Sequence, residues 1–254
     1  MVRLLPEGNR SSAGAGDACP DPGLPGGPSA AAYTSNTWAG LSRGEVRIES
    51  PIGVLASFAG PSAASATAFD PIAGGDPCAR VADDSVPATI IINLANPTSP
   101  GGYTVLGSPT LSFEALVDSA DVASTLIAAR LLDVDASGNE QLIARGVYRP
   151  DDSPGIQVFQ LAPIGFHVAA NHHLQLELLG NEAPTFRLSN LPFTINLNFL
   201  LLRIPVAEPP NGQDIHPPAP EDLPPGYVPE PGFAAMFGAG STLVAMLARR
   251  RRAQ

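Results

Sequence analysis

The feature that most constrains the fold is a series of short segments between residues 38 and 206 in which hydrophobic and polar residues alternate. The segment HHLQLELLG places Leu174, Leu176 and Leu178 on one face of a strand, with Gln175 and Glu177 opposite. Turn residues separate such segments at roughly ten-residue intervals, and convincing helical spacing is missing. The pattern predicts an all-β fold, an antiparallel sandwich or a galactose-binding-like jelly roll, rather than a parallel α/β sheet.

Several other segments supply the expected strands. GEVRIE alternates Val46 and Ile48 with charged residues, which should face water, and ATIIINLA is a continuous β-branched run that predicts a fully covered strand. STLIAARLLDV and QLIARGVYR flank the turn DASGNE and predict a hairpin. FTINLNFLLLRIPV is the longest segment, and its alternating apolar residues should share one face: Phe193, Ile195, Leu197 and Phe199.

The segments on either side of this body have a different composition. Residues 1–37 are rich in Gly, Pro, Ser and Ala, which predicts a flexible or extended lead-in before a domain at 38–205. Residues 206–231 are proline-dense and acidic, as in a semi-rigid linker. Residues 232–254 contain seventeen uncharged residues followed by four arginines; a helix of that length spans about 25 Å and is a marginal membrane span.

Charge and cysteine content narrow the function classes. The formal net charge is −10 and there is no lysine, so a body of this sign should repel nucleic acid and anionic lipid. Nothing in the sequence predicts a cofactor. Cys19 and Cys78 close one disulfide if the protein is exported, or are two unrelated thiols if it is cytosolic, and their spacing fits no zinc motif.

One pentapeptide has the pattern of a serine-hydrolase nucleophile. Gly40-Leu41-Ser42-Arg43-Gly44 fits G-x-S-x-G, but that elbow requires a buried strand before the serine and a helix after it. Here the serine is followed by RGEVRIES, which predicts a strand. We therefore interpret the match as fortuitous and expect no catalytic residue in this chain.

A second motif partly matches the sequence of a calcium-binding EF-hand loop. Asp133, Asp135, Ser137 and Gly138 occupy the first, third, fifth and sixth positions of an EF-hand loop, but Ala144 stands where a bidentate glutamate is required. A polar hairpin turn explains the same residues better.

The histidines and two arginines are candidate binding groups. His172 and His173 are adjacent at a strand start and should point to opposite faces, and near His167 no cysteine or carboxylate has ligand spacing, so no metal site is predicted. Arg130 and Arg145, near Asp133 and Glu140, either line a carbohydrate-binding face or form cross-strand ion pairs, and we favour the pairs.

Four stretches together resemble the C-terminal β-sandwich domain of X-Pro dipeptidyl-peptidase and cocaine-esterase-type serine hydrolases. They are WAGLSRGEVRIES, GGYTVLGSPTLSFEALV, IAARLLDVDASGNEQLIARGVYRP and VAANHHLQLELLG, with a DP-x-x-GG-x-x-C stretch from Asp70 to Cys78 between the first two. The resemblance implies a jelly roll that packs against an α/β-hydrolase domain, whose catalytic residues lie N-terminal to it and match no position here.

The C-terminus resembles a PEP-CTERM sorting signal, in which a Pro-Glu-Pro element precedes an apolar helix and an arginine cluster. The matching residues are Val228, Pro229, Glu230 and Pro231, and Arg249, Arg250, Arg251 and Arg252. The resemblance implies export, cleavage by an exosortase-type membrane protease, and a destination at the cell envelope or outside the cell. The N-terminus lacks the apolar core of a signal peptide, so we expect a misplaced start or a fragment.

These observations lead to three hypotheses, of which a self-sufficient hydrolase that uses Ser42 is the least favoured. The first is a noncatalytic accessory module of a secreted X-Pro dipeptidyl-peptidase-like hydrolase, partnered by a hydrolase domain encoded upstream. The alternative is a stand-alone exported surface protein that binds a glycan or another protein.

Overall fold

The computed structural model describes residues 2–4, 33–36, 40–50, 53–56, 64–76, 78–84, 90–119, 125–151, 155–186 and 191–218. The chain divides into two compact units, Met1–Glu221 and Asp222–Gln254. The second unit, which holds the predicted membrane segment and sorting motif, lies outside the described residues. Among the residues that are described, no helix is long and apolar enough to span a membrane.

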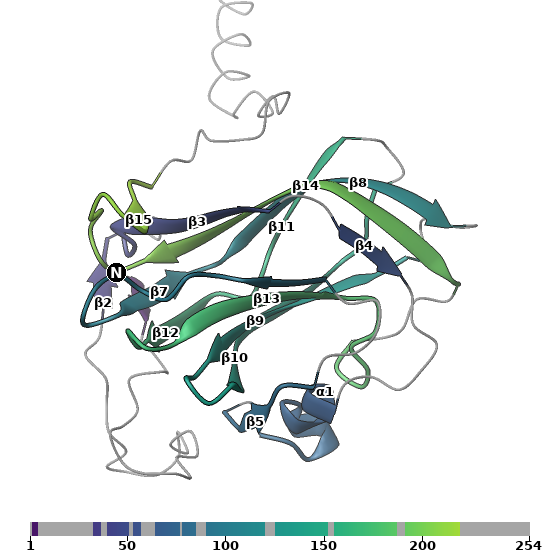
Figure 1. The fold of residues 1–254 in the computed structure, drawn as a ribbon, viewed down its shortest axis with the longest axis horizontal. Helices are drawn as coiled ribbons and strands as arrows, with labels where there is room; N and C mark the ends of the chain where they lie inside the picture. The colour runs from purple at the N-terminus through teal and green to yellow at the C-terminus, as the bar shows by residue number, and fades with distance from the viewer. Residues whose placement is uncertain are drawn as a thin grey trace, which may run out of the picture. The chain divides into compact units, whose positions relative to one another are not determined.

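Two antiparallel sheets face each other and form a β-sandwich (Figure 1). The larger sheet has the order β11-β8-β14-β3-β15, with β4 and β7 also paired to β14 and β12 paired to β7. The smaller has the order β5-β10-β9-β13-β6. This architecture confirms the predicted all-β antiparallel sandwich.

The strand bounds follow chain order. The larger sheet contains β3 (Gly44–Ser50), β4 (Gly53–Ala56), β7 (Tyr103–Gly107), β8 (Thr110–Ser119), β11 (Ile156–Gln160), β12 (Ile164–Val168), β14 (Phe193–Val206) and β15 (Ile215–His216). The smaller sheet contains β5 (Arg80–Ala82), β6 (Ile90–Asn93), β9 (Ile127–Val134), β10 (Asn139–Tyr148) and β13 (His173–Leu179). β1 (Val2–Leu4) pairs with β2 (Tyr33–Ser35) inside the lead-in, a pairing that its composition did not predict.

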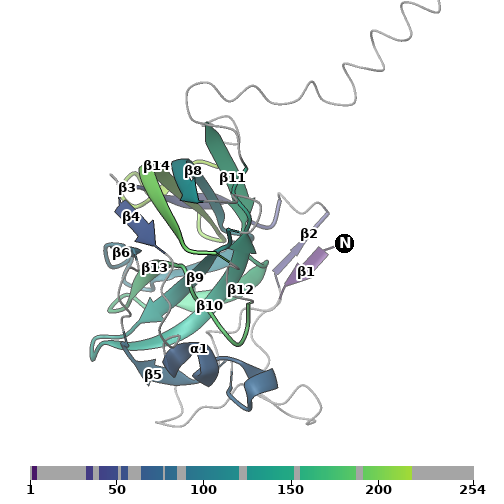
Figure 2. The same ribbon diagram turned by 90° about the vertical axis from the view of Figure 1, so that its right-hand side faces the viewer.

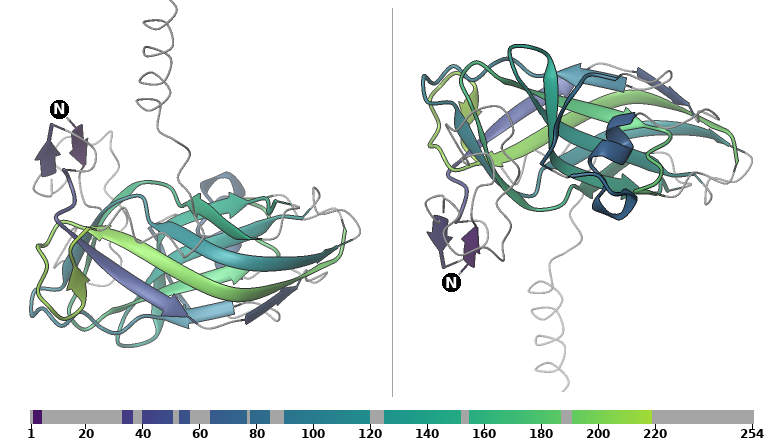
Figure 3. Two further views of the ribbon diagram at one scale, coloured as in Figure 1. Left: turned by 90° about the horizontal axis from the view of Figure 1, so that it is seen from above. Right: turned by 90° about the horizontal axis from the view of Figure 1, so that it is seen from below.

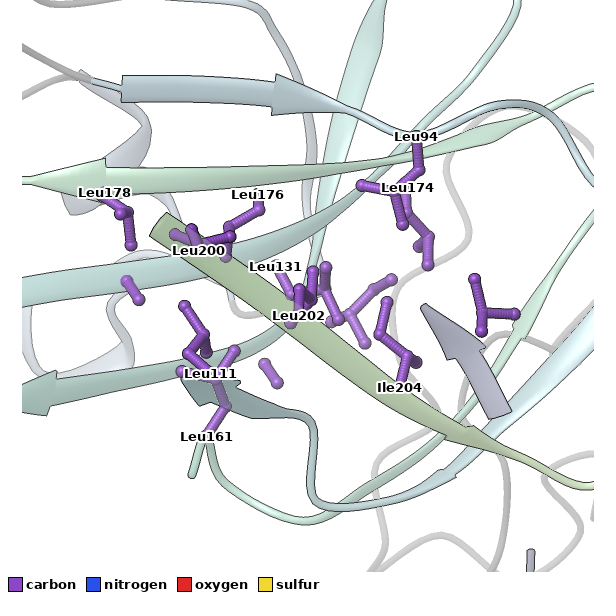
Figure 4. Close-up of a cluster of buried hydrophobic side chains, with 14 of the residues drawn as sticks. Leu94, Leu111, Leu131, Leu161, Leu174, Leu176, Leu178, Leu200, Leu202 and Ile204 are labelled. Atoms are coloured by element: carbon purple, nitrogen blue, oxygen red, sulfur yellow. The ribbon is translucent and has the colours of Figure 1, made fainter. Parts of the chain in front are cut away.

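The core between the sheets is almost purely aliphatic and aromatic. Leu174, Leu176 and Leu178 all point into it, as predicted, and they belong to one cluster with Leu131 of β9 and Leu202 of β14 (Figure 4). Full burial of one such side chain contributes about 1.5–3 kcal/mol. The sandwich is therefore held together mainly by side chains that alternate along each strand.

β14 is the longest strand and runs between β8 and β3 across the larger sheet (Figure 3). Its register with β8 shifts between Leu197 and Phe199. Such a bulge moves the inward positions by one residue, so Leu200 is buried and Phe199 is only half-buried. The prediction that Phe199 shares the face of Phe193, Ile195 and Leu197 is wrong for this reason.

Two further strand predictions need correction. The segment ATIIINLA forms β6 at the edge of the smaller sheet, where Ile91 is 39% exposed, so it is not fully covered. In β3, Glu45 does not face water, because Arg203 of β14 donates two hydrogen bonds to its carboxylate, at 2.8 and 2.6 Å, and buries it.

A short helical segment covers the smaller sheet. α1 (Ala64–Ala68) and η1 (Pro71–Ala73) lie beside β5 on the side away from the larger sheet (Figures 1 and 2). Phe69, just after α1, packs on Leu132 and Val134 of β9. The sequence pattern did not predict this helix, which is only five residues long.

Candidate functional site

A polar layer, most of it buried, lies between the smaller sheet and residues 64–76 and 78–84. The odd positions of β9, such as Ala129 and Leu131, belong to the sandwich core, so Arg130 projects from the other face. On β13 the same alternation places Gln175 and Glu177 on that face. The polar layer comprises Ser65, Asp83, Asp84, Arg130, Glu140, Gln175, Glu177 and Glu182.

Arg130 is the central cation of the polar layer and is only 1% exposed. Its Nε and Nη2 both contact Glu177 Oε2, at 2.8 and 2.6 Å, and its Nη1 donates to Ser65 Oγ at 2.6 Å. Glu182 Oε2 lies 3.7 Å from the same Nη1. A buried guanidinium without an anion is costly, and Glu177 and Glu182 supply the negative charge. The hydrogen bond to Ser65 joins α1 to the sheet.

Glu140 is as buried as Arg130, but one of its carboxylate oxygens has no hydrogen-bond partner among the described residues. It is 1% exposed; its Oε1 accepts a hydrogen bond from Gln175 Nε2 at 2.9 Å, while its Oε2 is buried with no hydrogen-bond partner among the described residues. Burial, and then the charges of Glu177 and Asp83, raise the pKa of Glu140 to about 7. Burial also raises the pKa of Glu182, which Arg130 partly offsets.

Three of these carboxylates converge. Asp83, Glu140 and Glu177 each offer one oxygen, and the three oxygens lie within 4.8 Å of one another. Hard cations such as Ca²⁺ take oxygen ligands of this kind. The sequence alone does not predict this group, because its members are far apart in the sequence and only the sheet pairing brings them together.

The DP-x-x-GG-x-x-C stretch builds the turn that follows α1. Asp70 caps η1 by accepting from the Ile72 backbone N–H, and its other oxygen accepts from Thr185 Oγ1 at 2.9 Å. The Thr185 contact, together with backbone N–H groups, holds the pKa of Asp70 below its usual value. Gly75 is required because a Cβ there would overlap the Thr67 and Ala68 carbonyl oxygens.

Arg130 forms a cross-strand ion pair, as predicted, but its partner is not one of the two predicted carboxylates. Arg130 pairs with Glu177, directly opposite on β13, rather than with Asp133 or Glu140. Arg145 donates to Thr185 Oγ1 at 2.7 Å. Since Arg130 is buried, it cannot line an open carbohydrate-binding face.

The residues of the EF-hand-like motif form the predicted β9–β10 hairpin turn. Asp135 Oδ1 accepts from the backbone N–H groups of Ser137 and Asn139, and Gly138 has a positive φ of 80°. Asp133 binds His172 Nδ1 and Arg80 Nη2, each at 2.8 Å, and Asp135 Oδ2 lies 3.6 Å from Nη1 of the same arginine. The two aspartates of the motif therefore share the guanidinium group of Arg80, a cation of the protein itself.

The structure also places the other two predicted histidines, His167 and His173. His167 Nδ1 lies 3.1 Å from Thr104 Oγ1, and His173 starts β13 next to His172. No group that could hold a metal includes a histidine among the residues that the structure describes.

Ser42 lies just ahead of a strand, as predicted. Gly44 begins β3, and the neighbouring Arg43 is fixed by hydrogen bonds between its backbone N–H and Val206 and between its Nε and Ala207 O. In the described part of the chain, no hydrogen bond joins Ser42 to an imidazole. The helix that a nucleophile elbow requires after the serine is replaced by β3.

The structure describes only one of the two cysteines of the predicted disulfide. Cys78 is buried and disulfide-bonded. Cys19 lies outside the described residues, so its pairing with Cys78 stays a prediction.

Comparisons with known proteins give structural neighbours only. No protein-family model and no curated protein matches this sequence. An α-amino acid ester hydrolase matches with a TM-score of 0.47 and 12% identity over 65% of this chain and 36% of its own. An aminopeptidase from a marine sediment Thaumarchaeota archaeon gives 0.47 and 11%, over 62% and 33% of the two chains.

A CocE/NonD family hydrolase from Staphylococcus aureus matches with a TM-score of 0.32 and 13% identity, over 50% of this chain and 34% of its own. This chain therefore spans about a third of the length of the solved structures it matches. Neighbours of this sandwich are thus found among CocE/NonD and amino acid ester hydrolases, but identities of 11–13% at these TM-scores do not establish a family.

Proposed function

We propose that this chain is a noncatalytic β-sandwich module of an exported serine hydrolase similar to the X-Pro dipeptidyl-peptidase and cocaine-esterase types. The position of Ser42 carries the proposal: the one serine with an elbow-like sequence leads directly into β3 and has no described histidine partner. The order of motifs along the chain, which resembles that of the accessory domain, supports the same conclusion.

The polar groups of the body support a structural rather than a catalytic use. A catalytic serine needs a base within hydrogen-bonding reach and a third group that orients the base. Among the described residues, Asp133 binds both His172 and Arg80, and His167 contacts Thr104. Neither contact involves a serine. In the proposed role the sandwich packs against a hydrolase domain and helps to shape the entrance to its active site.

A fluorophosphonate probe tests whether the chain has a nucleophile of its own. The purified 254-residue chain, Ser42→Ala and Ser137→Ala are incubated with the probe and mapped by mass spectrometry. Ser137 is an exposed serine of the hairpin turn and serves as the matched control. We expect no adduct on Ser42; an adduct that only Ser42→Ala abolishes would show that the chain is itself a hydrolase.

The C-terminal tail is proposed to act as an envelope-sorting signal. Its elements are the Pro-Glu-Pro residues 229–231, the apolar segment 232–248 and the arginines 249–252, recognised by an exosortase-type membrane protease. The disulfide bond of Cys78 supports an oxidising destination, because cytosolic proteins rarely keep such bonds.

Deletion of residues 229–254 tests the sorting proposal in the source cell. The truncated protein should lose proteolytic processing and be released instead of retained at the envelope. Substitution of the four arginines by glutamine keeps the apolar segment and should block retention as well. Unchanged processing and retention in both variants would contradict the assignment.

A further inference from the structure

The three converging carboxylates of the polar layer come from separate parts of the smaller sheet. Asp83 follows β5, Glu140 lies near the start of β10, and Glu177 lies in β13, with β9 between the last two strands. One oxygen from each lies within 4.8 Å of the others. Ca²⁺ binds oxygens at 2.3–2.6 Å, so two ligands on opposite sides of the ion are about 5 Å apart, and three such oxygens fit around one ion.

An independent observation shows that one buried oxygen of this cluster is unsatisfied. Glu140 is 1% exposed, yet its Oε2 is buried without a hydrogen bond among the described residues. Buried charged oxygens are normally paired or bound to a metal, because the loss of hydration is otherwise uncompensated. A bound cation or a retained proton would satisfy this oxygen.

The charge balance of the surrounding groups favours a cation. Among the described residues, the carboxylates of Asp83, Asp84, Glu140, Glu177 and Glu182 interact here with the guanidinium groups of Arg130 and Arg145. When all seven groups are ionised, together they carry three more negative than positive charges. Arg130 is already engaged by Glu177 Oε2 and Ser65, and Arg145 binds Thr185, so neither covers Glu140.

The side-chain amide of Gln175 lies at the same place and would supply a fourth oxygen after rotation. Its Nε2 donates to Glu140 Oε1 at 2.9 Å and to Glu177 Oε1 at 3.1 Å, which reduces the repulsion between the two carboxylates. A half-turn of the amide exchanges its nitrogen for its oxygen, which would then face a cation held by the same carboxylates. All four groups are hard oxygen donors, a set that suits Ca²⁺ rather than Zn²⁺ or Cu²⁺.

Asp83 gives the cluster its access to solvent. Its side chain is exposed, whereas Glu140 and Glu177 are buried. A cation can therefore enter from the Asp83 side and keep water molecules in its remaining coordination positions.

We propose that Asp83, Glu140 and Glu177, with Gln175, form a calcium-binding site that fixes residues 78–84 to β10 and β13. This site is separate from the EF-hand-like turn, whose Asp133 and Asp135 have other partners. Its role is structural, because the ion joins the segment that covers the smaller sheet to the sheet itself.

Calcium titration of the full 254-residue chain tests the proposal. The protein is stripped with EDTA, desalted, and followed by calorimetric melting and isothermal titration with CaCl₂, with MgCl₂ in parallel. We expect a saturable rise of the melting temperature, about 5–10 °C at a hundredfold excess over Kd. Mg²⁺ should bind at least tenfold more weakly. No rise, or an equal effect of Mg²⁺, would overturn the calcium assignment.

Variants show whether the effect arises at this cluster. Glu140→Gln should weaken calcium binding at least tenfold while the metal-free protein melts at the same or a higher temperature. Glu114→Gln, at an exposed glutamate of β8, is the matched control and should behave as wild type. Asp83→Asn, at the exposed edge, provides a second test that does not depend on how a core substitution folds. Wild-type affinity in both Glu140→Gln and Asp83→Asn would overturn the proposal.

Discussion

Removal of the Arg130 side chain should destabilise the protein more than most single substitutions. In Arg130→Met, Glu177 loses two contacts, at 2.8 and 2.6 Å, and Glu182 loses its nearest cation, 3.7 Å away. Both carboxylates remain buried, and loss of one partner of a buried pair costs about 3–5 kcal/mol. For a domain of this size the melting temperature should fall by about 6–20 °C.

Replacement of both partners should recover much of that loss. In Arg130→Met/Glu177→Leu no unpaired carboxylate is left at position 177, and well-packed apolar pairs often equal buried ion pairs in stability. Urea unfolding followed by circular dichroism, in EDTA, gives the free energies of the two single variants and the double variant. Exposed Arg149→Met is the control and should change stability by less than about 0.5 kcal/mol.

The double-mutant cycle gives a clear criterion. We expect a coupling energy of about 2 kcal/mol or more between positions 130 and 177. If Arg130→Met costs under about 1 kcal/mol, or if the double variant loses the sum of the single losses, the polar layer does not depend on this pair.

Three further predictions concern other parts of the fold. In the metal-free protein the pKa of Glu140 is about 7, against 4.5 ordinarily, so the folded state keeps a proton that the unfolded state has lost. Stability should therefore fall as pH rises from about 4.5 to 7, by up to about 3 kcal/mol, and urea titrations should show this slope reduced in Glu140→Gln. Gly75→Ala should cost about 2 kcal/mol or more in the same assay because its Cβ meets backbone carbonyl groups, whereas Gly101→Ala, with open space, should be nearly neutral. Non-reducing peptide mapping should find Cys19 linked to Cys78, and reduction should cost about 4 kcal/mol for a loop of this length; a free thiol at Cys19 would contradict the pairing.

The local sequence predicted the sandwich because its period-two pattern is a local property of each strand. Leu174, Leu176 and Leu178 lie in the core for that reason, and the β9–β10 hairpin follows from its turn residues. Phe199 was misplaced because a bulge depends on how β14 pairs with β8, which alternation alone does not specify.

The polar layer could not be predicted in the same way. Alternation puts Glu177 on the face opposite the core leucines, but only the segment with α1 and Phe69, packed on β9, makes that face buried. The convergence of Asp83 and Glu140 on Glu177 likewise depends on pairing between strands far apart in the sequence. A helix of five residues leaves no periodic signal from which this cover could have been inferred.

The size and reactivity of the native polypeptide that carries the sandwich test the proposed role most directly. An antibody raised against the purified chain is used on the source cell, before and after labelling with a fluorophosphonate. We expect a band longer than 254 residues by the length of a hydrolase domain, labelled at a serine outside residues 1–254. A native product of only this chain, or an adduct on Ser42, would contradict it.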